Sequence, residues 1–167
     1  MEYRMFKTIK SINATISINA SKSDVWQIWS KFTNVADYIA MIPKSYGIGD
    51  KESGLGSCRR CDISEKMQVD ERITAWNEGN SFSMEVYEST GLPLDIMEVD
   101  FSVQKIDNNT TQASMAIRYK MKSIMKFLPT NILLRKQAED HLKGLKHHIE
   151  SGNIITEDIM KALSKAA

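Results

Sequence analysis

The sequence is poor in the residues and patterns that mark several specialised classes of protein. Its 167 residues contain 3 Pro, 8 Gly and 2 Cys, too few for a long flexible linker or a disulfide scaffold. No stretch approaches the roughly 20 apolar residues that cross a bilayer, and the first residues lack the apolar segment of a signal peptide. We therefore expect no integral membrane segment and a cytoplasmic location.

An excess of charge of one sign is also lacking, since the formal net charge is +1. A dedicated nucleic-acid-binding domain usually carries a concentrated basic surface, so we expect no nucleic-acid partner. The charge is nevertheless uneven along the chain. From Arg118 onward there are 10 Lys and Arg against 5 Asp and Glu, which leaves 12 against 16 before it. This asymmetry weakly indicates an acidic partner.

The two cysteines, Cys58 and Cys61, have the spacing of a redox pair or of half a zinc site. They fall in a predicted strand, where residues three apart point to opposite faces, so the two thiols do not readily converge on one metal. No second pair of ligands has zinc-site spacing. We expect two ordinary reduced cysteines, no metal and no cofactor.

The first third of the chain predicts one strand and two short helices. Apolar and polar residues alternate from Ile12 to Ile18, which is the pattern of a half-buried strand. Residues 21–24 then form a helix-capping pattern, followed by apolar residues at helical spacing. We expect Asn34 to cap a second short helix, which continues through Ile42 and which Pro43 stops.

From about residue 44 to residue 121 the apolar residues recur with a period of two. Turn-forming residues interrupt this pattern at 52–56, 77–80, 91–93 and 107–109. The stretch therefore predicts six strands. Short turns join consecutive strands into an antiparallel meander, and with the first strand they form one seven-stranded sheet.

A long helix is predicted from near Pro129 to Ser151, and Gly152 is placed to end it. Its apolar stripe needs a partner, and the inner face of the sheet is the large apolar surface available. The stripe consists of Leu134, Ala138, Leu142, Leu145 and Ile149. After residue 152 the tail offers Thr156 as a cap for a short extra helix. The fold class is therefore α+β.

Three segments resemble the START-like, or SRPBCC, superfamily and its polyketide cyclase/dehydrase branch. They are residues 21–26 (SKSDVW), 54–59 (GLGSCR) and 69–76 (VDERITAW). The resemblance covers roughly residues 10 to 150 and implies a helix-grip fold, in which a curved sheet wraps around the C-terminal helix and encloses an apolar pocket. We accordingly expect a ligand-binding domain in residues 1–152 and a separate tail in residues 153–167.

Alternation assigns the pocket-facing residues if the more apolar set on each strand points inward. The side chains expected to contact a ligand come from the strands and from the helix stripe. They are Tyr46, Ile48, Met84, Met97, Phe101, Met115, Ile117, Leu142 and Leu145. The same side chains would equally well fill a solid core. The resemblance favours an open cavity, and apolar clefts with a few polar groups are typical binding sites for small molecules.

Four polar residues are candidates for chemistry in that pocket. Glu71 shares a face with Val69 and Ile73, where a partly desolvated carboxylate would be suited to proton transfer. Alternatively it lies near the open end of the sheet, or it pairs with Arg59, placed inward on the preceding strand. Tyr119 would donate a hydrogen bond to a ligand oxygen or to a backbone carbonyl. His141 borders the helix stripe as a proton-transfer group or as a boundary residue.

Two further surfaces are predicted outside the pocket itself. The loop containing Gly91, Leu92 and Pro93 is expected to form part of the pocket mouth and to move when a ligand enters; the alternative is a rigid hairpin turn. A basic row on the outer face of the last strand would be a solvated surface, or a dock for an acidic carrier protein or an anionic lipid headgroup. That row consists of Arg118, Lys120 and Lys122.

Two functions fit these patterns. The first is a non-catalytic carrier or sensor of a lipid, quinone or polyketide-like molecule. The second is a metal-free aromatase/cyclase or dehydratase, in which Glu71, Arg59, Tyr119 or His141 moves a proton. We favour the carrier, because the sequence shows no nucleophile and base motif and no phosphate-binding glycine loop.

Overall fold

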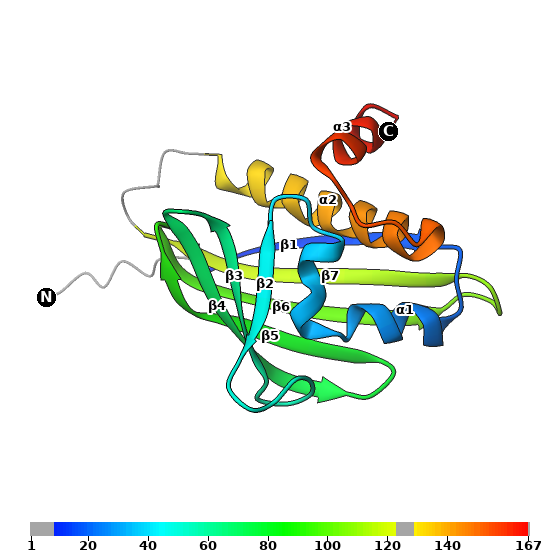
Figure 1. Ribbon diagram of the computed structural model, residues 1–167, viewed down its shortest axis with the longest axis horizontal. Helices are drawn as coiled ribbons and strands as arrows, with labels where there is room; N and C mark the ends of the chain where they lie inside the picture. Colours follow the sequence, from blue (N-terminus) through cyan, green and yellow to red (C-terminus); the bar gives the residue numbers. More distant parts are fainter. Residues whose placement is uncertain (1–8, 123–128, 167) are drawn as a thin grey trace, which may run out of the picture.

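The computed structural model describes residues 9–122 and 129–166, which form one antiparallel sheet and the helices packed on it (Figure 1). The sheet has seven strands in the order β1-β7-β6-β5-β4-β3-β2. In chain order the elements are β1 (Lys10–Ile18), α1 (Lys22–Trp29), η1 (Phe32–Asp37), β2 (Lys44–Ile48), β3 (Cys58–Ser64), β4 (Met67–Asn77), β5 (Ser81–Thr90), β6 (Leu94–Lys105), β7 (Thr111–Met121), α2 (Thr130–Ser151) and α3 (Glu157–Lys165).

This arrangement is the expected helix-grip α+β fold. The curved sheet follows the meander except at one point, where β1 pairs with the last strand, β7, in antiparallel register. The long helix α2 runs beside β1, and α1 with η1 lies nearer the other strands (Figure 1). Helices and sheet therefore enclose the apolar side chains between them.

Local sequence signals fix the start of α1 and the end of α2. The Ser21 hydroxyl accepts a hydrogen bond from the Asp24 amide at 3.2 Å and so caps α1. At the other end of the molecule, α2 ends at Gly152, whose φ of 73° is a left-handed conformation that glycine adopts without strain. A shorter helix, α3, follows with Thr156 as its N-cap.

The second short helix differs from its prediction, because η1 is a 3-10 helix that spans Phe32–Asp37 and Asn34 lies inside it. The carbonyl of Phe32, which an α-helix would pair with the amide of Ala36, accepts instead from the Arg59 side chain at 2.5 Å. The Ser45 hydroxyl donates a hydrogen bond to the next carbonyl, that of Thr33, and accepts one from the Ala36 amide. Side chains of the sheet therefore replace the bonds of an α-helix here.

The inner face of β2 was also assigned wrongly. Residues directly opposite each other in an antiparallel pair share a face, and Gly47 lies opposite the buried Arg59, whereas Tyr46 lies opposite Arg60. Tyr46 and Ile48 therefore point outward. The register with β3 is the reason, because it places Ser45 and Gly47 opposite the inward Cys61 and Arg59. A Cβ on Gly47 would make an ordinary contact with Thr33 of η1 at 3.4 Å.

Helix α2 touches the rest of the molecule most closely in its second half. A Cβ on Gly144 would lie 2.0 Å from the carbonyl oxygen of Tyr38, just after η1, so only glycine permits this approach. The amide of the buried Ile155 donates to the carbonyl of Asp37 at 2.9 Å, which ties the following segment to the same place.

Within residues 9–122 and 129–166, no helix is both long enough and apolar enough to cross a membrane.

Candidate functional site

A cavity of about 620 Å³ lies between the first half of α2 and the inner face of the sheet. Its wall consists of apolar side chains except for a few polar ones. The strands and the β5–β6 loop contribute Arg59, Ile63, Met67, Val69, Glu71, Met84, Val86, Leu92, Pro93, Leu94, Met97, Val99, Phe101, Met115, Ile117 and Met121; the segment after η1 contributes Ile39, Met41 and Ile42; and α2 with the residue before it contributes Pro129, Thr130, Leu133, Leu134, Gln137, Ala138 and His141.

Alternation on the central strands located much of this wall. Met84, Met97, Phe101, Met115 and Ile117 were assigned inward from the sequence, and all five line the cavity. Four methionines come from β5, β6 and β7, namely Met84, Met97, Met115 and Met121. The flexible thioether adapts to irregular shapes, so this wall suits ligands of varied outline.

The other expected ligand-contacting residues lie elsewhere. Leu142 and Leu145 are fully buried in the core, and neither lines the cavity. They follow His141, the last residue of α2 in the wall, where the helix meets the Tyr38 segment and no space remains. Tyr46 and Ile48 lie on the outer face of the sheet, as described above.

Sequence reasoning missed the side of the cavity that lies opposite the strands. Residues 39–42 were expected to continue a short helix, which in the structure ends at Asp37, and their place in the cavity wall was not foreseen. Leu133 lies beside Leu134, which the helix stripe did include, and the run of apolar residues at 132–134 was the available signal.

The loop between β5 and β6 borders the cavity through Leu92 and Pro93. Gly91 is needed at its tip, because its φ is 75° and an added Cβ would lie 2.1 Å from the carbonyl oxygen of Lys66. The Lys122 amide donates to the Pro93 carbonyl at 2.9 Å. The loop therefore borders the cavity and is held by a close backbone contact on one side.

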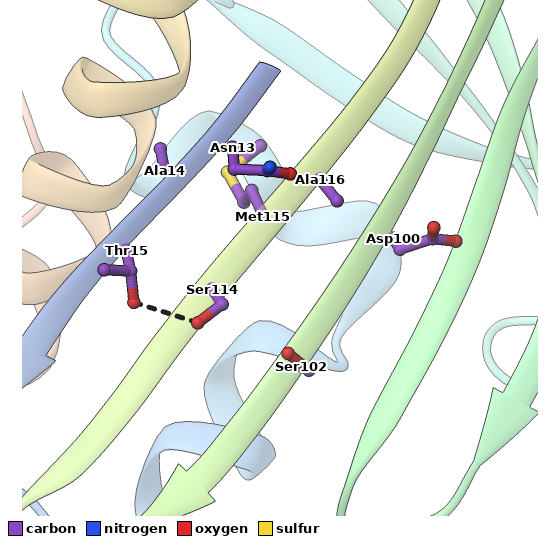
Figure 2. Close-up of a pocket in the computed structure, with 8 residues that line it drawn as sticks. All are labelled: Asn13, Ala14, Thr15, Asp100, Ser102, Ser114, Met115 and Ala116. Carbon is purple, nitrogen blue, oxygen red and sulfur yellow. Dashed lines mark hydrogen bonds between the residues drawn. The ribbon is translucent and has the colours of Figure 1, made fainter. Parts of the chain in front are cut away.

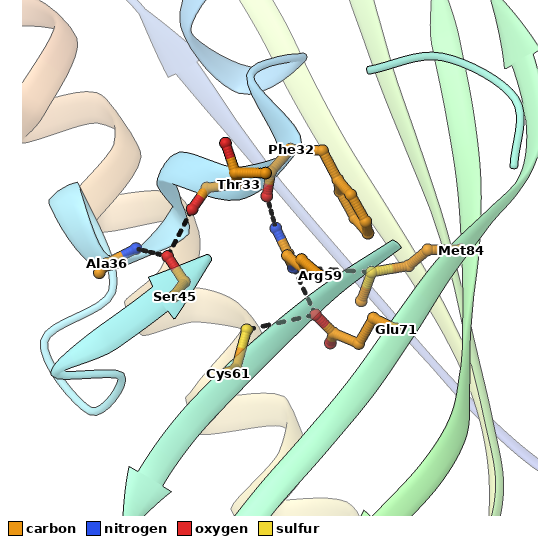
Figure 3. A network of polar contacts seen from close by, with 8 residues as sticks. All are labelled: Phe32, Thr33, Ala36, Ser45, Arg59, Cys61, Glu71 and Met84. Atoms are coloured by element: carbon orange, nitrogen blue, oxygen red, sulfur yellow. Dashed lines mark hydrogen bonds and ion pairs between the residues drawn. The ribbon is translucent and has the colours of Figure 1, made fainter. Parts of the chain in front are cut away.

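The main polar group of the wall is an ion pair between Arg59 on β3 and Glu71 on β4 (Figure 3). Arg59 Nε donates to Glu71 Oε2 at 2.5 Å, and both side chains are more than 90% buried. Arg59 Nη2 also donates to the Met84 sulfur at 3.6 Å. The Arg59 guanidinium lies 4.1 Å from the centre of the Phe32 ring. Arg59 thus binds Glu71, Met84 and Phe32 at once.

The pairing changes the chemistry of the groups around it. Burial acts to lower the pKa of Arg59, but the Glu71 carboxylate, together with the neighbouring Cys61 and Tyr38, raises that pKa overall. Burial, followed by the charge of Glu71, raises the pKa of the Cys61 thiol. Burial also raises the pKa of the Tyr38 hydroxyl. Arg59 is therefore charged, whereas Cys61 and Tyr38 are neutral.

His141 lies beside this pair as a neutral ring. Trp29 Nε1 donates a hydrogen bond to His141 Nε2 at 3.2 Å, and the ring packs against Tyr38 and Phe101. Burial, with a smaller contribution from the positive charge of Arg59, lowers the pKa of His141 to about 3.

Tyr119, the fourth polar candidate, is fully buried but does not line the cavity. Its hydroxyl lies 3.4 Å from the hydroxyl of Thr130 in the first turn of α2. Arg59, Glu71 and His141 are therefore brought into one wall, and Tyr119 instead joins β7 to α2 behind it.

The cysteines and the basic row lie apart from the cavity. Cys61 is buried beside Glu71, whereas Cys58 is half-buried on the other face, and both are free thiols. The described residues contain no group of three metal-ligating side chains. On the outer face of β7, Arg118 pairs with Glu98 and Asp100 at 3.0 and 3.1 Å, so part of the basic row is already neutralised.

A second, shallower hollow of about 280 Å³ lies on the outer face of the sheet across β1, β7 and β6 (Figure 2). The depression forms because the side chains that line it, such as Ser102, Ser114 and Ala116, are small. The hydroxyls of Thr15 and Ser114 form a hydrogen bond across it at 2.9 Å. Its polar groups lie open to water, so it lacks the enclosed apolar wall of the larger cavity.

Comparison with known proteins agrees with the geometry. The family model described as "Polyketide cyclase / dehydrase and lipid transport" matches residues 10–150. No curated protein sequence matches the chain.

Similar solved structures show the same fold at low sequence identity. An uncharacterised protein from Bacillus thuringiensis is 17% identical with a TM-score of 0.72, over 85% of this chain and 100% of that one. The protein XoxI from Bacillus cereus is 16% identical with a TM-score of 0.72, over 84% and 96%. A START superfamily protein from Mycobacterium smegmatis is 15% identical with a TM-score of 0.70, over 86% and 99%.

Proposed function

The chain belongs to the polyketide cyclase/dehydrase and lipid transport family, and we propose that it is a non-catalytic carrier or sensor of a hydrophobic small molecule of the lipid, quinone or polyketide class. The observation that carries this proposal is the apolar cavity of about 620 Å³ under the first half of α2. This volume lies within the range of small-molecule sites, in which apolar walls provide affinity and a few polar groups orient the ligand.

The state of the polar residues favours a carrier over an enzyme. Glu71 already accepts bonds from Arg59 and from the Cys61 thiol, so its charge is engaged with the protein. His141 has a pKa of about 3 and uses one ring nitrogen to bind Trp29. A base effective near neutral pH needs a pKa close to that pH, and His141 is too weak a base.

Filling the cavity tests its role. Met97 lines the cavity on β6, and the change Met97→Trp should occupy space that a ligand needs. We expect wild-type protein to bind the apolar fluorescent dye Nile red saturably, and Met97→Trp to bind it at least about tenfold more weakly. The matched control is Ile106→Trp at an exposed turn, which should bind like wild type.

Circular dichroism melts establish that both tryptophan variants are folded. Equal dye affinity in Met97→Trp and wild type would show that the dye binds elsewhere and would remove the cavity from the proposal. Native mass spectrometry of freshly purified protein then identifies any small molecule that accompanies the chain.

A metal-free cyclase or dehydratase is the second candidate, supported by one observation: Arg59, Glu71 and His141 lie in the same cavity wall. A synthetic poly-β-ketone thioester, incubated with the protein, tests it. An aromatic product that wild type forms, and that folded Glu71→Gln does not, would replace the carrier proposal with the enzyme. Unchanged substrate in the presence of saturable dye binding would leave the carrier.

The β5–β6 loop is proposed as the entrance, supported by the position of Leu92 and Pro93 in the cavity wall. Hydrogen exchange of residues 89–94 with and without Nile red tests this, because a loop that opens for entry should gain protection when the cavity fills. Equal exchange in both states would make the loop a rigid turn.

Location and protein partners complete the proposal. A cytoplasmic location is supported by two free cysteines. Docking of an acidic carrier protein at Arg118, Lys120 and Lys122 has weaker support, because Glu98 and Asp100 already bind Arg118.

A further inference from the structure

His141 is fixed in one orientation by three aromatic neighbours. Its ring centroid lies 6.1 Å from that of Trp29, 5.4 Å from that of Tyr38 and 5.8 Å from that of Phe101. These residues come from α1, from the segment after η1 and from β6. The ring therefore has little freedom to turn, and each of its two nitrogens has a defined direction.

The bond from Trp29 determines which nitrogen carries the proton. An indole N–H can only donate, so His141 Nε2 must accept with its lone pair. In a neutral imidazole the remaining proton is then on Nδ1, which becomes a donor. The pKa of about 3, lowered by burial and by Arg59, keeps the ring in this neutral form over the physiological pH range.

The Nδ1 donor has no bond within the described part of the chain. There, every fully enclosed side-chain nitrogen or oxygen has a hydrogen-bond partner. His141 Nδ1 has none among these residues, so it is not fully enclosed. Because His141 lines the cavity and is otherwise buried, the cavity is the space that Nδ1 reaches.

The charges of the wall limit what can bind there. Among its described residues the ionised side chains are Arg59 and Glu71, and these two neutralise each other at 2.5 Å. A charged ligand would therefore lie in an apolar enclosure without a counterion, which is strongly disfavoured. A carboxylate would in addition compete with Glu71 for Arg59.

These observations concern the ligand of the carrier function proposed above, and the inference rests on that function. We propose that His141 Nδ1–H donates a hydrogen bond to a carbonyl oxygen of an uncharged, otherwise apolar ligand. The site then selects ketones, quinones or esters over hydrocarbons of the same shape and over carboxylic acids.

Three rigid probes of one shape test this selection: fluorene, 9-fluorenone and fluorene-9-carboxylate. Fluorenone differs from fluorene in its carbonyl oxygen, and the third probe adds a charge. A net contribution typical of a neutral hydrogen bond, about 1 kcal/mol, corresponds to about fivefold tighter binding. We expect wild type to bind fluorenone about fivefold more tightly than fluorene, and the carboxylate most weakly, in displacement of Nile red.

Matched variants assign the preference to His141. The change His141→Phe keeps an aromatic ring but removes the donor, so the fluorenone preference should fall to about one while the affinity for fluorene is kept. His148→Gln changes a histidine two turns further along α2 that lies outside the cavity wall, and should keep the fivefold preference. Trp29→Phe removes the bond that sets the tautomer and should reduce the preference.

Nitrogen-15 NMR of histidine-labelled protein reads the same donor directly. We expect a protonated Nδ1 and an unprotonated Nε2 at His141, and a shift of Nδ1 on adding fluorenone but not fluorene. A proton on Nε2, or an Nδ1 that fluorenone leaves unchanged, would overturn the inference even if His141→Phe failed to fold.

The outcomes separate this inference from the proposed function. If fluorene and fluorenone both bind saturably and His141→Phe keeps the wild-type ratio, the donor role is wrong and the carrier function stands. Tightest binding of the carboxylate would likewise overturn the selection for uncharged ligands. If neither neutral probe nor Nile red saturates wild type, the carrier function fails and this inference fails with it.

Discussion

The two faces of the β3–β4 pair carry the same kind of interaction in different surroundings. On the inner face Arg59 binds Glu71, with side chains 4% and 8% exposed. One residue further along β3, on the outer face, Arg60 binds Asp70 through two bonds of 2.6 Å, and its side chain is 36% exposed. Neighbouring residues of one strand thus place one arginine in an apolar cavity wall and the other at the surface.

A bulge in β4 buries the carboxylates of both ion pairs. The register with β5 shifts between Asp70 and Glu71, and Val69, Asp70 and Glu71 are all buried. Strict alternation would leave Asp70 exposed, whereas here both carboxylates are covered and each has an arginine. The partner alone therefore does not decide the energetic role of an ion pair, because the solvent around the pair sets the cost of losing one member.

The largest expected difference follows from removing one carboxylate charge on each face. Glu71→Gln leaves Arg59 buried without a counterion and should lower the free energy of unfolding by about 3 to 5 kcal/mol. Asp70→Asn leaves Arg60 partly in water and should cost distinctly less. Urea denaturation of both variants measures the difference, and equal losses would show that the faces do not differ in this way.

Acid should lower the free energy of unfolding through His141 in the cavity wall. The pKa of His141 is lowered from 6.5 to about 3 by burial and by Arg59. Below pH 6.5 the unfolded chain binds a proton there that the folded chain does not, so stability falls as pH falls. A one-unit difference in pKa is worth about 1.4 kcal/mol, which gives a loss of up to about 2 kcal/mol between pH 6.5 and 5.

The variant His141→Phe isolates that effect, because it removes the titrating ring and keeps an aromatic side chain. Its stability should change less than that of wild type over the same interval, as measured by urea denaturation at each pH. Identical slopes in the two proteins would contradict a buried neutral His141.

On β2 the comparison predicts opposite responses at adjacent residues. Gly47→Val extends methyl groups beyond a Cβ that would already contact Thr33 of η1 at 3.4 Å, and should cost about 1 kcal/mol by overpacking. Tyr46→Ala removes an outward side chain that is 37% exposed, and the stability should stay within about 0.5 kcal/mol of wild type. A larger loss at Tyr46 than at Gly47 in thermal melts would reverse the assignment of faces.

The smallest expected effect concerns reactivity and leaves stability unchanged. Burial and Glu71 raise the pKa of the Cys61 thiol, so little reactive thiolate is present there. The half-buried Cys58 lies on the outer face. Ellman's reagent should therefore react faster with one thiol, and Cys58→Ser should abolish that fast phase while Cys61→Ser keeps it.

Alternation in the sequence predicted the inner face where strands are long and both faces differ clearly. On β5 to β7 the apolar set turned inward, so Met84, Phe101 and Ile117 line the cavity as expected. The method failed on β2, a strand of five residues whose register with β3 turns Ser45 and Gly47 to the inner face beside η1. In that strand the register outweighs the apolar pattern, which points the wrong way.

Contacts between distant segments were beyond the reach of periodicity. The pairing of Arg59 with Glu71 was one of three alternatives open from the sequence, since both lie inward on adjacent strands. The bond between Trp29 and His141 joins residues 112 positions apart, and nothing in either helix pattern relates them. The end of the cavity at His141 likewise depends on the close approach of Gly144 to Tyr38.

The pairing of the first strand with the last has a consequence in time. Thr15 on β1 bonds to residues of β7, and the bond to the Ala113 carbonyl spans 98 positions of the chain. Synthesis proceeds at about 5 to 20 residues per second, so β1 waits roughly 5 to 20 seconds for its partner to be made. During that interval Ile12 and Ile18, both buried in the finished sheet, have no strand to pair with. Every other strand of the sheet pairs with a strand next to it in sequence. The first strand therefore waits longest for a partner, with apolar side chains exposed to aggregation meanwhile.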